Sequence, residues 1–231
     1  YTIKYSSGGE SYSAEVPAFT NAGTYKVYYV ISADNCYDKS GSVTITIGQK
    51  DLTITADDKT VTYGDAKPEL TYNAEGFVEN ETQKNIVLSC DYQQGSNVGS
   101  YPIVVSYAND NYKVSLVNGA LTVNKKVVVL DVVGKKEFDN TVWSNTYSIP
   151  AEQLFAGDSL TVTVKTNDTI GSYTGGTNLI VTVDGKRGET DVTANYDVQL
   201  GTVNVVIENI DMNVTVNNVT EEYDGQDHSP V

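Results

Sequence analysis

Residues 97–101 read Asn-Val-Gly-Ser-Tyr, a short pattern that decides the fold because it returns elsewhere in the chain. It occurs earlier as Asn21-Ala22-Gly23-Thr24-Tyr25 and later, more loosely, as Thr169-Ile170-Gly171-Ser172-Tyr173. The glycines of the three copies are 76 and 72 residues apart. A motif that recurs at nearly constant spacing is typical of tandem repeats, in which each copy folds as one small unit.

Each copy also contains an Asn-Tyr element and a closing strand. The Asn-Tyr elements are Asp34-Asn35-Cys36-Tyr37, Asp110-Asn111-Tyr112 and Ala194-Asn195-Tyr196. The closing strands alternate apolar and polar residues, which predicts that one face of each strand is buried. The apolar positions are Val43, Ile45 and Ile47 in the first copy, Leu121 and Val123 in the second, and Val203, Val205 and Ile207 in the third.

Each copy opens with another alternating stretch, followed by an aromatic turn. In the second copy Leu52, Ile54 and Ala56 precede Tyr63-Gly64-Asp65, and in the third Val127 and Val129 precede Phe138-Asp139-Asn140. A fourth opening consists of Met212, Val214 and Val216 before Tyr223-Asp224-Gly225. The third copy has about a dozen extra residues around Asp184-Gly185-Lys186-Arg187-Gly188, interpreted as a longer hairpin because Asp-Gly favours tight turns.

The whole pattern predicts an all-β chain of tandem small immunoglobulin-like antiparallel β-sandwich repeats. Only Ala151-Glu152-Gln153-Leu154 looks briefly helical. Because the connections between copies are a few residues long, we expect an elongated rod. The expected domains are 1–49, the C-terminal part of an incomplete repeat; 50–125, a complete repeat; 126–210, a divergent repeat with the inserted hairpin; and 211–231, the opening strands of the next repeat.

Composition excludes several classes of function. The 231 residues include 30 acidic and 15 basic ones, a formal charge of −15 that repels phosphate backbones and anionic lipids, so we expect no nucleic-acid partner and no membrane insertion. One histidine, His228, cannot form a catalytic dyad or a His-based zinc site. Cys36 and Cys90 lie in different copies, so both are expected to be free. We predict no enzyme, no cofactor and no metal; since the chain opens with Tyr1, it is interpreted as an internal slice of a longer protein.

The segment from Lys50 to Lys126 resembles the MBG-type repeat of bacterial surface proteins in its Tyr-Gly-X variant, and Tyr223-Asp224-Gly225-Gln226 resembles the related YDG-type opening. The resemblance implies a secreted or cell-wall location, occurrence in tandem arrays, and no catalytic residues. It is carried by residues 52–59, Tyr63-Gly64-Asp65, residues 68–72, residues 97–101 and residues 118–123.

Three groups of side chains are candidates for a specific role. Tyr25, Tyr101 and Tyr173 are interpreted as packing residues whose hydroxyls reach a backbone group, as in a tyrosine corner. Trp143, the only tryptophan, either stacks on a sugar ring or lies half-buried on an edge strand. Acidic clusters at Asp57-Asp58, at Glu79-Asn80-Glu81 and at Asp34-Asn35 with Asp38 either ligate calcium or are solvated loop carboxylates, the reading we favour.

Two classes of function follow. The chain is either a non-catalytic stalk of a bacterial adhesin-like surface protein or a module that binds a host or plant glycan or a protein, with 126–210 and Trp143 as the favoured site. Its expected partners are neighbouring repeats. The opening strands in 211–231 are expected to pair with the incomplete repeat in 1–49, more readily in a neighbouring molecule.

Overall fold

The computed structural model describes residues 1–79, 85–167, 170–212, 214–215, 220 and 222–226. It is all-β, with 54% of the described residues in strands and 3% in helices. The chain divides into two compact units, Tyr1–Lys126 and Val127–Val231, which are described separately. Among the described residues, no helix is long and apolar enough to cross a membrane.

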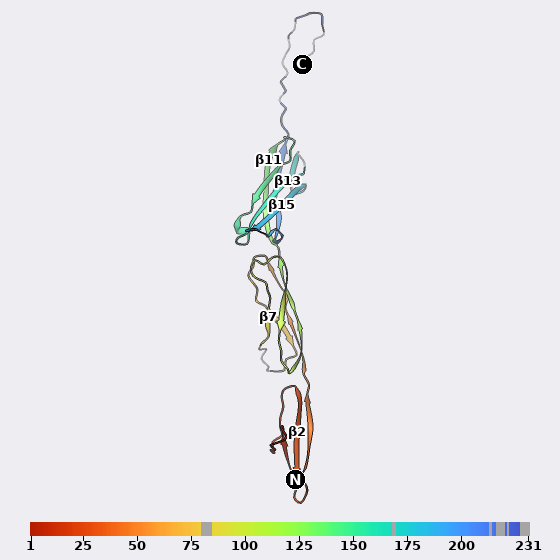
Figure 1. Cartoon of the computed structure of the whole chain (residues 1–231). Helices are drawn as coiled ribbons and strands as arrows, with labels where there is room; N and C mark the ends of the chain where they lie inside the picture. The colour runs from red at the N-terminus through yellow and green to blue at the C-terminus, as the bar shows by residue number, and fades with distance from the viewer. Residues whose placement is uncertain (80–84, 168–169, 213, 216–219, 221, 227–231) are drawn as a thin grey trace. The chain divides into compact units, whose positions relative to one another are not determined.

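Residues 1–47 form one antiparallel sheet in the order β1-β2-β3, comprising β1 (Thr2–Ser6), β2 (Gly23–Ser32) and β3 (Lys39–Ile47) (Figure 1). Val27, at the centre of β2, is 3% exposed. On β3, however, Val43 is 51% exposed and Ile45 38%. The expectation that both side chains face a core is therefore wrong for this structure, because among the described residues β3 is an edge strand with a neighbour on one side only.

Residues 50–124 form two sheets that share one core. The first has the order β6-β4-β9 and the second β5-β10-β8-β7, and apolar residues of both are buried. The strands are β4 (Lys50–Ala56), β5 (Lys59–Thr62), β6 (Tyr72–Glu75), β7 (Val87–Ser89), β8 (Gly99–Ser106), β9 (Tyr112–Val117) and β10 (Gly119–Asn124).

Two of these strand pairs are parallel, β4 with β9 and β5 with β10, which corrects the expectation of a purely antiparallel arrangement. The reason is a shared switch between sheets. The chain leaves the first sheet at Asp57-Asp58 and again at Asn118, so β4–β5 and β9–β10 are two long extended segments that advance side by side. Each segment contributes one strand to each sheet.

The core of this segment follows the alternation of its sequence. Leu52, Ile54 and Ala56 are at most 4% exposed, and Leu121 and Val123 at most 3%, as the pattern predicts. Full burial of one such aliphatic side chain is worth about 1.5–3 kcal/mol. The remaining buried apolar side chains of the segment are Tyr63, Cys90, Tyr92, Ile103, Val105 and Tyr112.

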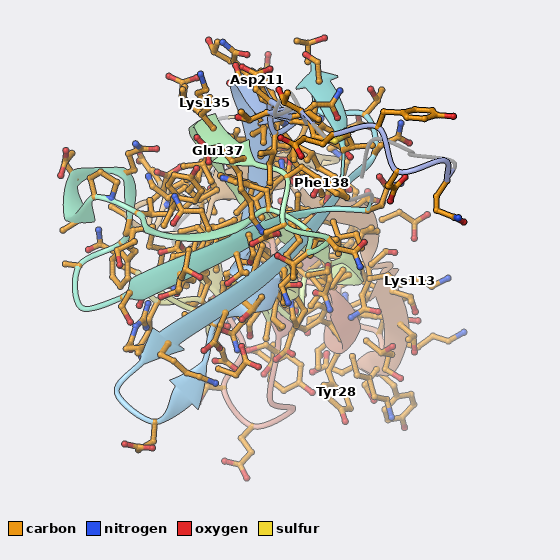
Figure 2. The ribbon with its side chains drawn as sticks, turned by 90° about the horizontal axis from the view of Figure 1, so that it is seen from above. Tyr28, Lys113, Lys135, Glu137, Phe138 and Asp211 are labelled. Atoms are coloured by element: carbon orange, nitrogen blue, oxygen red, sulfur yellow. The ribbon has the colours of Figure 1, made fainter. Side chains whose placement is uncertain are left out.

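The second unit also has two sheets, in the orders β11-β17-β14 and β12-β13-β15-β16. The N–H of Phe138, after β11, donates to the carbonyl of Glu208 at 2.8 Å, and the N–H of Thr202 donates to Asp131 Oδ1 at 2.6 Å, so β11 and β17 run in the same direction. Phe138 and Asp211 follow these strands (Figure 2). The strands are β11 (Lys126–Glu137), β12 (Ser144–Ser148), β13 (Ser159–Thr166), β14 (Gly171–Thr174), β15 (Leu179–Arg187), β16 (Thr190–Asp191) and β17 (Tyr196–Glu208).

The buried face of β11 is one residue out of step with the sequence interpretation. Val127 and Val129 are 51% and 54% exposed, whereas Val128 and Val132 are fully buried. In a strand, a shift of one residue moves the whole apolar set to the opposite face. Residues 127–129 are all valines, so the sequence pattern fits burial of either face of the strand. On β17, by contrast, Val203, Val205 and Ile207 are buried as predicted.

The inserted hairpin is present, but its turn is not at Asp184-Gly185. Gly185 lies inside β15, where an added Cβ would be 2.8 Å from the Leu160 side chain. The turn lies instead at Gly188-Glu189, between β15 and β16, and Gly188 has a φ of +56°. The short helical stretch is confirmed as the 3-10 helix η1 (Ala151–Gln153), and a second one, η2 (Thr193–Asn195), was not anticipated.

Candidate functional site

The recurring Asn-x-Gly-Thr/Ser-Tyr motif forms a tyrosine corner in each copy. The Tyr25 hydroxyl donates to the carbonyl of Asn21 at 2.9 Å, and the Tyr101 hydroxyl donates to the carbonyl of Asn97 at 2.8 Å. In the looser third copy, the Tyr173 hydroxyl reaches the carbonyl of Ile170 at 3.3 Å. The predicted hydroxyl-to-backbone contact is therefore present in all three copies. The Tyr173 ring is buried, whereas the Tyr25 and Tyr101 rings are only half-buried.

The motif needs its glycine for the backbone that precedes each corner. Gly23, Gly99 and Gly171 have φ values of +157°, +149° and +136°, a region that residues with a Cβ rarely adopt. Each strand begins at this glycine, and the tyrosine two positions later directs its hydroxyl back to a backbone carbonyl that precedes the glycine. The glycine of the motif therefore recurs because each copy begins its strand with a positive φ.

The corner of the first sheet is held by the second segment through Asn111. The backbone N–H of Ala22 donates to Asn111 Oδ1 at 2.8 Å, and Asn111 Nδ2 donates to Asn21 Oδ1 at 3.2 Å. The Asn111 carbonyl accepts the N–H of Lys50 at 3.0 Å. One residue of an Asn-Tyr element thus binds both the Asn-Ala corner of the preceding sheet and the first residue of β4.

The connection between β3 and β4 is short and has bonds of its own. Only Gly48 and Gln49 separate the two strands, and Gln49 Nε2 donates to the carbonyl of Asp110 at 3.0 Å. The Lys50 ammonium donates to the carbonyl of Phe77 at 3.2 Å. These contacts and the Asn111 contacts together form what we call the Asn111 junction, made of residues 21–22, 48–50, 77 and 110–111.

The acidic pair Asp57-Asp58 stabilises the switch between the two sheets. Asp58 Oδ1 accepts the N–H of Ala120 at 2.7 Å, while Asp57 accepts a hydrogen bond from the Thr71 hydroxyl, which itself accepts from Lys59 at 2.7 Å. The two chains approach closely here, since a Cβ on Gly119 would lie 2.8 Å from the Ala56 carbonyl oxygen.

No metal centre is visible in the part of the chain that the structure describes, because no three His, Cys, Asp or Glu side chains gather there. Asp34 and Asp38, in the first candidate cluster, are exposed. Asn80 and Glu81, in another, lie outside the described residues. Cys36 is exposed and Cys90 buried, and both are free, as predicted.

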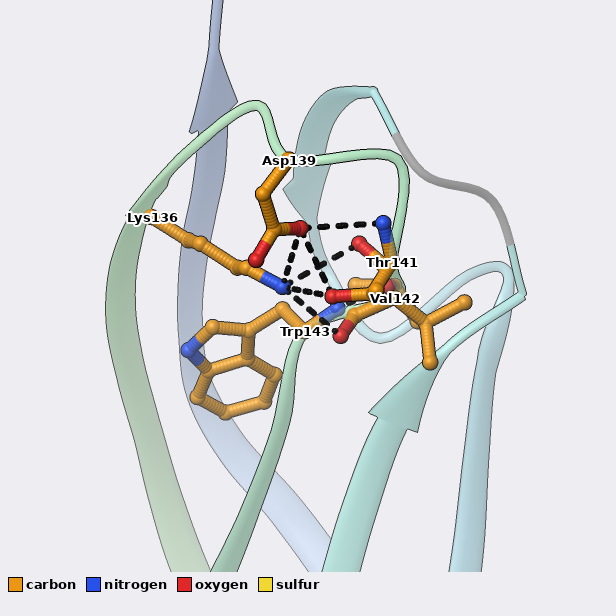
Figure 3. A network of polar contacts seen from close by, with 6 residues as sticks. Lys136, Asp139, Thr141, Val142 and Trp143 are labelled. Carbon is orange, nitrogen blue, oxygen red and sulfur yellow. Dashed lines mark hydrogen bonds and ion pairs between the residues drawn. The ribbon is translucent and has the colours of Figure 1, made fainter.

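A polar network lies beside Trp143 (Figure 3). Lys136 Nζ pairs with Asp139 at 2.8 Å and donates to the carbonyls of Thr141 and Val142 at 3.2 and 3.3 Å. The hydrogen bonds from Lys136, and then those from Thr141, lower the pKa of the exposed Asp139 carboxyl to about 2. The network closes the loop between β11 and β12.

Trp143 itself is 7% exposed. The indole ring packs over Gly134, where an added Cβ would be 2.4 Å from the ring. The backbone N–H of Trp143 donates to Thr166 Oγ1 at 3.0 Å. The ring is more deeply buried than the half-buried edge-strand position considered from the sequence. A sugar needs an open aromatic face to stack on. Sugar binding through Trp143 stays a prediction, and this packing does not support it.

The sequence of the second segment, residues 50–124, matches a known family. Residues 52–122 match the sequence model of the MBG domain, YGX type. This segment is an MBG domain. No curated protein matches the chain. The matched residues contain both sheets of the segment apart from the ends of β4 and β10, together with the corner at Tyr101 and Asn111 of the junction.

The Asn-Tyr element of the MBG domain has a counterpart in the second unit. Tyr112 is 3% exposed, and its hydroxyl accepts the N–H of Val78 at 3.0 Å. Tyr196 is 4% exposed, and its hydroxyl accepts the N–H of Phe155 at 3.0 Å. In both copies the tyrosine ties a long loop to the core from within, which is a structural role.

In the second unit this tyrosine contacts an ion pair with a buried carboxylate, which sequence reasoning missed. The side chain of Asp158 is fully buried, and its Oδ1 accepts from Arg187 Nε at 2.6 Å while its Oδ2 accepts from the Tyr196 hydroxyl at 2.7 Å. The Arg187 guanidinium also lies 4.6 Å from the centre of the Phe155 ring. One signal was available, since Arg187 is the only arginine in the sequence and lies in the inserted hairpin.

Proposed function

We propose that this chain is a non-catalytic stalk or spacer region of a bacterial surface or secreted adhesin-like protein. Its repeats hold one another at a set spacing so that another part of the protein is presented away from the cell. The MBG domain at residues 52–122 supports this proposal through the family to which it belongs. The observation that carries it is the Asn111 junction, because a spacer transmits position only if neighbouring repeats cannot swivel freely.

The junction suits this role through short connections and polar pairing. Two residues separate β3 from β4, so the linker itself has little freedom. A net contribution of about 0.5–1.5 kcal/mol for each hydrogen bond makes the Asn111 contacts sufficient to favour one arrangement of the corner. All the contacts are hydrogen bonds made by backbone groups or by polar side chains, and such groups tolerate water.

The proposal includes the arrangement expected from the sequence, namely tandem immunoglobulin-like sandwiches extended as a rod, with neighbouring repeats as the first partners. It also includes an extracellular location. The surplus of 15 acidic residues suits a protein that must stay soluble beside anionic surfaces. Small-angle scattering of the full chain tests the shape independently of the function.

Surface display tests the function itself. A short epitope placed after residue 226 is displayed on bacterial cells through one, two or three copies of the chain, and its accessibility to an antibody is measured on cells with a dense capsule. If the chain is a spacer, accessibility of the epitope should rise with each added copy. The rise should be less steep when every copy carries Asn111→Ala. Accessibility that does not depend on copy number would contradict the proposal.

A binding function is the competing outcome. The full chain is applied to host and plant glycan arrays and to mucin, with Trp143→Phe as the variant that preserves most of the buried packing. Saturable binding that depends on residues in 126–210 would favour a binding module over a spacer. A spacer predicts no saturable binding to any of these surfaces.

A further inference from the structure

The first and last strands of the MBG domain run in the same direction and share one register. β4 pairs in parallel with β9, and β5 pairs in parallel with β10. In both pairs the partners are 62 residues apart, from Lys50 with Tyr112 to Thr62 with Asn124. The register therefore does not slip where the two segments change sheets. We call these segments, residues 50–63 and 111–124, the terminal pair.

Backbone hydrogen bonds close the terminal pair at both ends. At its beginning, the N–H of Lys50 donates to the carbonyl of Asn111 at 3.0 Å. At its end, the N–H of Tyr63, in the aromatic turn, donates to the carbonyl of Asn124 at 2.8 Å. The Tyr63 ring is fully buried, so the last bond is anchored in the core of the domain.

Asp58 links the two segments in the middle, where the backbone pairing is interrupted. The pairing of β4 with β9 ends at Thr55, and that of β5 with β10 begins at Lys59. Asp58 Oδ1 accepts the N–H of Ala120 at 2.7 Å, and these two residues are also 62 positions apart. A hydrogen bond to a carboxylate is stronger than one between neutral groups. The side chain thus continues the pairing across the change of sheet.

The second unit repeats this arrangement. Its first and last strands, β11 and β17, are neighbours in one sheet and run in the same direction. Asp131 Oδ1 accepts the N–H of Thr202 at 2.6 Å, and the N–H of Phe138, in the aromatic turn, donates to the carbonyl of Glu208 at 2.8 Å. A central aspartate and the amide of the aromatic turn therefore recur in two units whose remaining strands are arranged differently.

The parallel direction decides how a load along the chain acts on the terminal pair. Load enters the MBG domain at Lys50 and leaves it at Asn124, and in a parallel pair these two residues lie at opposite ends. Pulling them apart slides one segment along the other and strains all the hydrogen bonds between them together. A pull across the strands breaks the same bonds one after another. The terminal pair is therefore strongest against load along the chain.

We propose that the paired first and last strands of each unit are a mechanical clamp against unfolding under load along the chain, with Asp58 and Asp131 as the central links. The use of this clamp rests on the proposed spacer function, because a stalk that presents another part of the protein carries load along its chain. Single-molecule pulling measures the clamp alone, whereas the display experiment measures the spacer alone. Either proposal can therefore fail while the other holds.

Pulling on the full chain by handles at its two ends, under constant force, tests the central link of the MBG domain. Asp58→Ala is compared with Asn118→Ala, because Asn118 Oδ1 also accepts a backbone N–H, that of Val105 at 3.1 Å, but joins the last segment to β8. We expect Asp58→Ala to accelerate unfolding of the MBG domain about tenfold and Asn118→Ala by less than about twofold. Equal acceleration by the two variants would overturn the proposal.

The second unit is an internal control in the same recordings, since the length of chain released identifies the unit that unfolds. Asp58→Ala should leave unfolding of the second unit unchanged. Asp131→Ala should accelerate unfolding of the second unit about tenfold and leave the MBG domain unchanged. An effect of either variant on both units would contradict the assignment of one clamp to each unit.

A change of pulling direction tests the clamp without removing any of its bonds. Thr60, Thr122 and Ser100 lie side by side across β5, β10 and β8, and all three are exposed. Handles on Thr60→Cys and Ser100→Cys, in a Cys36→Ser background that removes the exposed native thiol, pull across the strands. The MBG domain should then unfold at about half the force, or less, that it withstands along the chain. An equal or higher force across the strands would overturn the proposal.

Discussion

Asn111 accepts the backbone N–H of Ala22, 89 residues earlier in the chain, at 2.8 Å through its side-chain oxygen. The two residues belong to different recurring motifs, the Asn-Tyr element and the tyrosine corner. Their hydrogen bond joins the first sheet to the MBG domain. At this join, between residues 1–47 and the MBG domain, the two motifs therefore hold neighbouring segments together.

Asn111→Ala should loosen this join. Without the side-chain oxygen the Ala22 N–H loses its acceptor, and we expect its hydrogen exchange to accelerate by about tenfold, equivalent to one hydrogen bond of about 1.4 kcal/mol. Asp110→Ala is the control, since Asp110 contributes its backbone carbonyl to the junction. Unchanged exchange at Ala22 in Asn111→Ala would show that the contact does not order the corner.

Tyr101→Phe should destabilise the MBG domain by about 1 kcal/mol, because the carbonyl of Asn97 loses the hydroxyl that donates to it at 2.8 Å. The measurement is denaturation in urea, followed through the backbone amide signals of Ile103 and Leu121. Tyr37→Phe removes a hydroxyl from a fully exposed ring and should change nothing measurable. A Tyr101→Phe variant as stable as the original would show that the hydrogen bond between the Tyr101 hydroxyl and the Asn97 carbonyl does not stabilise the domain.

Gly119→Ala should be among the most damaging single-methyl changes in the MBG domain. The added Cβ would lie 2.8 and 2.9 Å from the carbonyl oxygens of Ala56 and Asp57, and both belong to backbone that cannot move independently. We expect a loss of about 1–3 kcal/mol, the usual effect of overpacking. Gly8→Ala, with nothing within 4 Å, is the control in the same denaturation experiment.

Asp158→Asn should destabilise the second unit by about 1.5–3 kcal/mol, because the buried carboxylate loses its charged hydrogen bond with the partly exposed Arg187. Asp184→Asn breaks the exposed pair with Lys186 and should cost at most about 1 kcal/mol. Thermal unfolding monitored by Trp143 fluorescence reports on this unit. Similar losses of stability in the two variants would mean that the Asp158–Arg187 pair stabilises this unit no more than an exposed ion pair does.

The Asp139 carboxyl should titrate at about pH 2, because Lys136 and Thr141 donate to its charged form. A folded-state pKa lowered in this way stabilises the loop above the unfolded pKa, near 3.9, and the effect is lost as the pH falls through about 2. Carboxyl carbon NMR measures the midpoint directly. Lys136→Met should raise it, whereas Lys135→Met, which affects the pair with Glu208, should leave it in place.

The sequence by itself determined the repeat, the all-β class and the local devices. Gly99 and Tyr101 could be interpreted correctly because a turn that needs positive φ and a strand that starts beside it depend on neighbouring residues alone. The same holds for Leu52, Ile54, Leu121 and Val123, whose alternation with polar residues allows one buried face only.

Tertiary structure alone decided matters that depend on distant partners. The sequence did not decide which face of β11 is buried, because consecutive valines fit either register. Packing in the second unit buries Val128 and leaves Val127 exposed. The parallel pairing of β5 with β10 arose from two chain segments switching sheets together. The Asn111 junction and the Asp158–Arg187 pair join residues 89 and 29 positions apart, and no local pattern specifies which polar side chains meet across such distances.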